Sequence, residues 1–125
     1  MLNDVNFVLI DGTAKKIKVV NDIIEKLKLP NVKGLHKRAE EMKYKFDFVV
    51  TRAVTTMDIL QRWSIPLLKN ASVGEMPSGI FAYKGGNYND ELKLINRKNY
   101  YEVNKIYNKF PEEYFNEKVI IYLQK

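Results

Sequence analysis

Four polar sites in this 125-residue sequence each follow a short apolar run: Asp11, the segment Arg38-Ala39-Glu40, Arg52 and Lys84. Short apolar runs that are rich in β-branched residues and end at polar ones are typical of buried strands. The carboxyl ends of parallel strands meet at one edge of a sheet, and ligands bind at that edge. The four sites are therefore predicted to form a binding site at the edge of a sheet.

Each of these residues can be interpreted either as a ligand-binding residue or as a structural or surface residue. A carboxylate at Asp11 can accept both hydroxyls of a ribose, or it can serve as a helix-start residue beside the positive end of the helix dipole. Glu40 either borders an adenine ring or is surface charge alone. A guanidinium directly after a buried strand, as at Arg52, needs a carboxylate, a phosphate or a ligand, and a structural ion pair would also serve. Lys84, before Gly85-Gly86, either contacts phosphate or is a solvated turn lysine.

Several kinds of site are excluded by the residues that the sequence lacks. It has no cysteine and one histidine, which rules out thiol nucleophiles, disulfides, thiolate metal sites and multi-histidine metal sites. His36 is expected to be structural. The six glycines form neither a GxGxxG nor a Walker A motif. No apolar run is long enough to span a membrane and the start has no signal-peptide pattern, so a cytoplasmic location is expected.

The formal net charge is +6, and the basic excess lies in the first part of the chain, where residues 1–45 carry ten Lys or Arg against six Asp or Glu. Such an excess favours an anionic partner, with nucleic acid first and an acidic membrane surface second. A lysine-rich surface without a partner is the alternative. Tyr100, Tyr101 and Tyr107 offer rings that could stack on bases, although tyrosines in strands more often serve packing.

The elements that position these residues alternate between strands and helices, which predicts an α/β fold with a mostly parallel sheet in one domain, residues 1–125. A capping box at Thr55 and Asp58 is expected to start the second helix, and Pro66 to kink or end it. Leu60, Trp63, Leu67 and Leu68 are expected inward. The predicted strands are 6–10, 32–36, 46–51, 79–83, 100–107 and 118–123, and the predicted helices are about 15 residues from Thr13, 55–68 and 89–96. Residues 38–45 are expected to form a loop or a single helical turn, 70–78 a loop, and 110–117 the connection between the last two strands.

Five short motifs, taken in order, resemble the RsmG (GidB) family of methyltransferases, which act on guanine N7 of 16S ribosomal RNA. The order and spacing agree from about residue 5 to residue 95. The motifs are Val8-Leu9-Ile10-Asp11-Gly12-Thr13-Ala14-Lys15-Lys16-Ile17, Arg38-Ala39-Glu40-Glu41, Phe46-Asp47-Phe48-Val49-Val50-Thr51-Arg52-Ala53-Val54, Pro66-Leu67-Leu68-Lys69 and Ala82-Tyr83-Lys84-Gly85.

The resemblance implies a Rossmann-like class I methyltransferase sheet that uses S-adenosylmethionine (SAM) and acts on the small ribosomal subunit. It implies that Ala39, Glu40 and Arg52 contact the cofactor, that Asp11 is a ribose partner, and that Lys84 faces the RNA. Arg52 would orient the cofactor or the edge of the base. No catalytic acid, base or metal is implied, because guanine N7 carries a free lone pair and no proton.

The resemblance also implies a sheet ordered 3-2-1-4-5-7-6 with a C-terminal antiparallel pair, from which the first strand and its Gly-rich loop are missing. Two inner edges are then left without partners. Three outcomes are open: direct pairing of the two neighbouring strands, association with another chain through these edges, or marginal folding. A non-catalytic RNA- or nucleotide-binding module is the alternative function. A receiver-like signalling domain is disfavoured, because the strand that would need an acidic phosphoacceptor ends His36-Lys37-Arg38.

Overall fold

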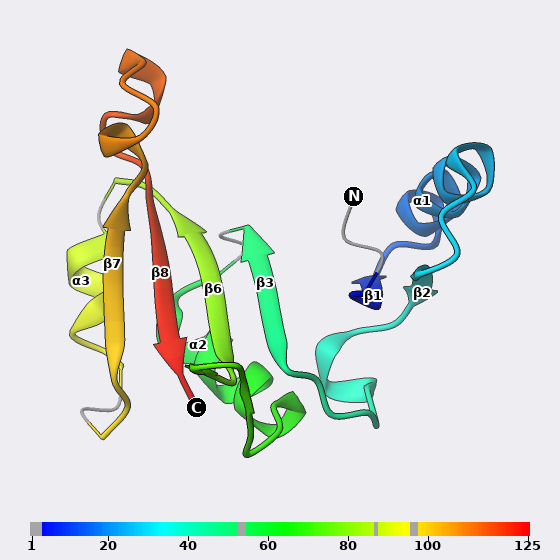
Figure 1. Ribbon diagram of the computed structural model, residues 1–125, viewed down its shortest axis with the longest axis horizontal. Coiled ribbons are helices and arrows are strands. Elements are labelled where there is room, and N and C mark those ends of the chain that lie inside the picture. Colours follow the sequence, from blue (N-terminus) through cyan, green and yellow to red (C-terminus); the bar gives the residue numbers. More distant parts are fainter. Residues whose placement is uncertain (1–3, 53–54, 87, 96–97) are drawn as a thin grey trace. The chain divides into compact units, whose positions relative to one another are not determined.

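The chain divides into two compact units, Met1–Met42 and Lys43–Lys125. The computed structural model describes residues 4–52, 55–86, 88–95 and 98–125. The first unit contains a two-stranded sheet, and the second contains a four-stranded sheet and a separate two-stranded one (Figure 1). The expectation of one partial domain over 1–125 stays a prediction.

The first unit is a strand–helix–strand arrangement. Strand β1 (Phe7–Asp11) pairs in parallel with β2 (Val32–His36), and helix α1 (Ala14–Leu27) connects them. The helix is capped at its C-terminal end by Lys28, whose φ of 52° is left-handed and which lies two residues before Pro30. A single 3₁₀ turn, η1 (Ala39–Glu41), follows β2. The three elements predicted here from apolar runs and helical spacing are confirmed.

Fewer apolar residues of α1 are buried than their helical spacing predicts. Ile17 is buried at 6% exposure. Ile23 and Leu27 have the same helical spacing, yet they are exposed in the structure. Five residues of β1 and five of β2 offer a small surface, so they leave the end of the helix uncovered.

The second unit is built on a four-stranded sheet in the order β3-β6-β8-β7. The central strands β6 (Gly79–Lys84) and β8 (Val119–Gln124) are antiparallel. On one side β3 (Phe48–Arg52) runs parallel to β6, and on the other β7 (Tyr101–Lys105) runs antiparallel to β8. Within this unit, and for the β1–β2 pair, the predicted strand order is confirmed. The two-strand pairing at the C-terminal end is the predicted antiparallel pair.

One face of this sheet is covered by helices. Figure 1 shows α2 (Met57–Ser64) and α3 (Tyr88–Leu92) on the same side of the strands. Because side chains alternate along a strand, every second residue points to this face. The buried core there consists of Met57, Leu60, Leu68, Ile80, Ala82, Ile95, Val119, Ile121 and Leu123.

The start and end of α2 correct one expectation and confirm another. The N-cap is Thr56, not Thr55, and the Thr56 hydroxyl donates to the Asp58 carboxylate, so the predicted capping box does not form. The helix ends at Ser64 and continues as a 3₁₀ turn, η2 (Ile65–Leu67), which contains Pro66. The early end expected from the missing N–H of proline is confirmed.

Two more expectations in this unit need correction. Trp63, expected inward, is 40% exposed, whereas the leucines predicted with it are buried. The segment 70–78, expected as a loop, contains a short hairpin of β4 (Ser72–Val73) and β5 (Met76–Pro77). Its turn places Gly74 at a φ of 61°, a backbone conformation that glycine adopts without steric cost.

The last elements lie beyond the ends of the strands. Strand β7 stops at Lys105, earlier than the predicted 107, and two 3₁₀ turns follow, η3 (Ile106–Asn108) and η4 (Glu113–Phe115). Figure 1 shows this orange segment at the edge where β3, β6 and β7 end. The helix predicted at 89–96 is the short α3, and Asn96 lies outside the described residues.

Of the three outcomes expected for the inner edges, direct pairing of the two neighbouring strands is not seen among the described strands. β1 pairs with β2, and β3 pairs with β6 in a different sheet. Association with another chain through an edge strand stays a prediction.

Replacing Ile121 by alanine is expected to lower the free energy of unfolding by about 2–5 kcal/mol, because its side chain is fully buried between β8 and the helices. Ile120 is its matched control: it lies on the opposite face and is 38% exposed, so Ile120→Ala should cost about 1 kcal/mol or less. Urea denaturation measures both. Equal losses would contradict the assignment of a single covered face.

Candidate functional site

The carboxyl edge of the first unit brings Asp11 and His36 together. The two are register partners at the ends of β1 and β2. An Asp11 carboxylate oxygen accepts the Thr13 N–H at 2.7 Å, and this hydrogen bond is the main cause that lowers the Asp11 pKa, with Lys16 and His36 adding smaller effects. The ring of His36 is hydrogen-bonded through Nε2 to the Gly12 carbonyl at 3.0 Å. Asp11 is therefore an ionised carboxylate held at the start of α1.

The segment after β2 lies at the same edge of this unit. The side chain of Arg38 passes Gly12, where a Cβ would come within 3.6 Å of its Cγ and Nε atoms. Arg38 is extended and precedes the turn η1, on which Ala39 is half-buried and Glu40 is exposed. Asp11 at the end of β1, and Ala39 and Glu40 on the turn after β2, thus lie at one edge of this two-stranded sheet, whereas Arg52 and Lys84 belong to the second unit. A single binding site made of all four segments stays a prediction.

In the second unit, Arg52 ends β3 with an exposed side chain. Its register partner is Tyr83 on β6, and the guanidinium carbon lies 5.7 Å from the centre of the Tyr83 ring. Among the described residues no carboxylate forms an ion pair with Arg52. Its protein contact is a cation–π interaction, which leaves the guanidinium N–H groups available to a ligand.

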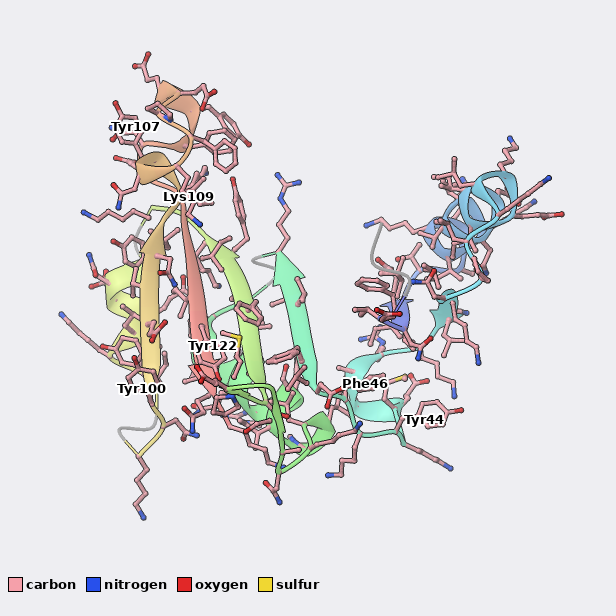
Figure 2. All side chains as sticks on the ribbon, in the orientation of Figure 1. Tyr44, Phe46, Tyr100, Tyr107, Lys109 and Tyr122 are labelled. Carbon is pink, nitrogen blue, oxygen red and sulfur yellow. The ribbon has the colours of Figure 1, made fainter. Side chains whose placement is uncertain are left out.

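An open cavity of about 460 Å³ lies beside Arg52. It is lined by Val50, Thr51, Arg52, Tyr83 and Tyr114. Partial burial raises the pKa of the Tyr83 hydroxyl, Tyr114 raises it further, and Arg52 opposes the rise. Figure 2 shows the side chains of this unit, with Tyr107 and Lys109 labelled on the segment beyond the strand ends.

Lys84 is buried and paired within the second unit. Its side chain is only 4% exposed, and its amine forms an ion pair with Glu91 at 2.7 Å. The amine also donates to the Thr55 carbonyl, and the same Glu91 oxygen accepts the Met57 N–H at 3.1 Å. Lys84 is therefore not a solvated turn lysine: it joins the end of β6 to the start of α2 and to α3. A direct contact between Lys84 and RNA stays a prediction.

The two tyrosines of the cavity, Tyr83 and Tyr114, were not expected at the site. The tyrosines that the sequence singles out are 100, 101 and 107, and none of these lines the cavity. Tyr83 could have been found from strand alternation, since it must face the opposite side from Lys84. Tyr114 reaches the cavity from a 3₁₀ turn far along the chain, which no periodic pattern reveals.

The described residues contain no group of three His, Cys, Asp or Glu that could hold a metal ion. Nor does any described helix have the length and apolar character needed to cross a membrane. At its strand ends the first unit offers a carboxylate, that of Asp11, and the second unit offers a guanidinium and aromatic rings. Groups of these kinds are able to bind and orient a ligand.

Comparisons with known proteins place the chain among RNA methyltransferases. Residues 1–117 match the family described as rRNA small subunit methyltransferase G (GidB). A relative of that name from Flavobacterium johnsoniae is 39% identical over 96% of this chain and 56% of its own length. Another, from Porphyromonas gingivalis, is 36% identical over 95% of this chain and 53% of its own length. The chain thus spans about half the length of the curated relatives it matches.

Solved structures show the same fold at low sequence identity. An rRNA methylase from Streptococcus thermophilus has a TM-score of 0.63 at 8% identity, covering 99% of this chain and 76% of that protein. A Streptococcus mutans protein, assigned as a methyltransferase and solved with SAH, has a TM-score of 0.59 at 8% identity and covers 96% of this chain and 76% of its own. The predicted Rossmann-like methyltransferase fold is confirmed.

Replacing Lys84 by methionine is expected to lower the free energy of unfolding by about 2–4 kcal/mol, because Glu91 and the Thr55 carbonyl lose a buried charged partner. Lys93→Met is the matched control, since Lys93 is 79% exposed and its 3.9 Å pair with Asp90 is solvated, so its effect should stay within about 0.5 kcal/mol. Chemical denaturation measures both. A Lys84→Met chain with wild-type stability would contradict the structural role.

Proposed function

The chain belongs to the rRNA small subunit methyltransferase G family, and from this we propose that its residues take part in the SAM-dependent methylation of guanine N7 in 16S rRNA. The match over residues 1–117 is the observation that carries the proposal. The relatives' name supplies the substrate class, small-subunit ribosomal RNA. The proposed reaction occurs where small ribosomal subunits are, in the cytoplasm.

The residues of the first unit fit the adenosyl part of the cofactor. A carboxylate has about four acceptor sites, so the Thr13 donor does not exhaust Asp11, and its lowered pKa keeps it ionised as a ribose acceptor needs to be. Ala39 and Glu40 lie at the same sheet edge and are proposed to border the adenine. When bound, SAM supplies the methyl group that is transferred.

In the second unit, Arg52 is proposed to orient the cofactor or the edge of the base. Its guanidinium is exposed, lies over Tyr83, and has no described carboxylate as an ion-pair partner. The N–H donors of arginine lie in one plane, so they can fix the orientation of a planar or anionic ligand.

The proposed chemistry needs no acid, base or metal from the protein. Guanine N7 has a lone pair and carries no proton, so it attacks the methyl carbon directly. The N7–carbon bond forms as the carbon–sulfur bond breaks, and the bonding pair leaves with sulfur. Positioning and electrostatics then supply the rate enhancement, so the proposed role of Arg52 and the rings beside it is to orient the reactants.

RNA binding is proposed to rest on the basic excess of the chain, in which 21 Lys and Arg stand against 15 Asp and Glu. Lysine and arginine contacts to phosphate hold and orient RNA without reading its sequence. Recognition of the acceptor base has to come from groups near the strand ends, where the polar and aromatic side chains are.

The isolated 125-residue chain is expected to bind SAM weakly or not at all, because its glycines form no Gly-rich loop for the methionine end. Fusing it to the part of the Flavobacterium johnsoniae relative that it does not match should restore binding, measured by calorimetry. The fusion should also methylate 30S subunits that lack the N7 methyl group. A fusion that folds and binds SAM without methylating RNA would contradict the proposed function, and a low-micromolar Kd for the isolated chain would contradict the binding prediction.

In that fusion, Arg52→Ala is expected to lower methyl transfer by on the order of 100-fold or more, because the guanidinium that orients the reactants is lost. The fold should survive, since the side chain is exposed. Arg62→Ala is the control, an exposed arginine on α2 away from the strand ends. Methyl transfer and a thermal melt are measured together: unchanged transfer would contradict the role, and a loss of folding would assign Arg52 to structure instead.

A further inference from the structure

We propose that the cavity lined by Arg52, Tyr83 and Tyr114 binds the acceptor guanine of the RNA by stacking. This inference rests on the proposed function and deepens it, because it names the residues that hold the base. Nothing in the sequence motifs assigns Tyr83 or Tyr114 a role. The argument starts from how the sheet and the last 3₁₀ turn bring the three side chains together.

The sheet supplies two walls of the cavity. Val50 and Arg52 are two residues apart on β3, so they point to the same face, which is the one opposite the helices. Tyr83 on β6 is the register partner of Arg52 and faces the same way. Val50 is 79% exposed. The apolar floor and the guanidinium are thus both open to a ligand.

The third wall comes from η4. Tyr114 lines the cavity beside Tyr83, and it raises the pKa of the Tyr83 hydroxyl after the larger effect of burial. Its ring packs edge-on against Phe115 with the centroids 5.0 Å apart, and its side chain is 63% exposed. Tyr114 therefore presents a ring that is held in place by a neighbour and still accessible.

A basic group lies at the rim. The Lys118 amine is 5.8 Å from the centre of the Tyr114 ring. It also lies against Gly85, where a Cβ would come within 2.9 Å of the amine. The glycine at this turn is thus what gives Lys118 its room. Arg52 and Lys118 together place positive charge beside two tyrosine rings.

This combination of groups matches a nucleotide. Aromatic rings and guanidinium planes stack on unpaired bases, and the cations meet the phosphates that flank them. The cavity is open to solvent, so a base is able to reach the rings without being enclosed. Stacking also suits the reaction, because it holds guanine by its faces and leaves N7 at the ring edge uncovered.

Stacking on these rings would also hold the adenine of the cofactor, so the test compares the binding of a guanine nucleotide with that of the cofactor product. The 125-residue chain is labelled on tyrosine and titrated with GMP and, separately, with SAH, and the tyrosine signals are followed by NMR. GMP is expected to shift the signals of Tyr83 and Tyr114. Shifts of these two signals by SAH with displacement of GMP would overturn the proposal in favour of a cofactor site, as would the absence of any shift with GMP.

Variants of Tyr114 distinguish the loss of the aromatic ring from a loss of folding. Tyr114→Ala should weaken GMP binding at least about fivefold, whereas Tyr114→Phe keeps the ring and should bind within about twofold of the wild type. Tyr107→Ala is the matched control: Tyr107 belongs to the same strand-end segment, is 40% exposed and does not line the cavity. Unchanged GMP binding by Tyr114→Ala would overturn the proposal.

This experiment and the test of the proposed function fail in different ways. GMP binding needs neither cofactor nor methyl transfer, so a fusion that does not methylate leaves the cavity assignment standing. Conversely, a fusion that methylates equally well with Tyr114→Ala would overturn the cavity assignment and leave the proposed function intact.

Discussion

The alternation of side chains along β6 controls what the second unit buries and what it presents to a ligand. Ile80, Ala82 and Lys84 point toward the helices and are buried, whereas Phe81 and Tyr83 point to the opposite face. A shift of one residue in register would expose the core and bury the aromatic face. The antiparallel pairing with β8 fixes that register, with Ala82 opposite Ile121 and Lys84 opposite Val119.

Lys84 shows how this constraint turns a polar residue into a structural one. It falls on the buried face, and an ammonium group there is unfavourable unless it is paired. Glu91 and the Thr55 carbonyl pair it, and they come from opposite sides of β6 in the sequence. The ion pair thus fixes the start of α2 and the position of α3 against the strand end. In the sequence Lys84 looks like a ligand contact, but in the structure it holds the end of β6 against α2 and α3.

Local signals were enough to predict most of the fold, and contacts between distant segments account for the rest. Strands such as Phe7–Asp11 and Phe48–Arg52 are apolar runs that end at a polar residue, and the Pro66 stop acts within one turn. The hairpin at 72–77 was missed because strands of two residues have no period to detect. The N-cap of α2 is Thr56 and not Thr55, whose carbonyl accepts a hydrogen bond from the distant Lys84. At the site, strand ends predicted Asp11 and Arg52, whereas Tyr114 depends on a turn whose position only the fold determines.

The absence of a proton to move explains why such a sparse set of residues is sufficient for the proposed chemistry. An arginine that donated in the plane of guanine to O6 and N7 would engage the lone pair that must attack the methyl group. Arg52 instead lies over the Tyr83 ring, with its guanidinium carbon 5.7 Å from the ring centre, in a cation–π contact. A guanine that stacks on the rings of this face would keep its N7 edge free. The aromatic face that β6 leaves uncovered is therefore suited to positioning a nucleophile that needs no activation.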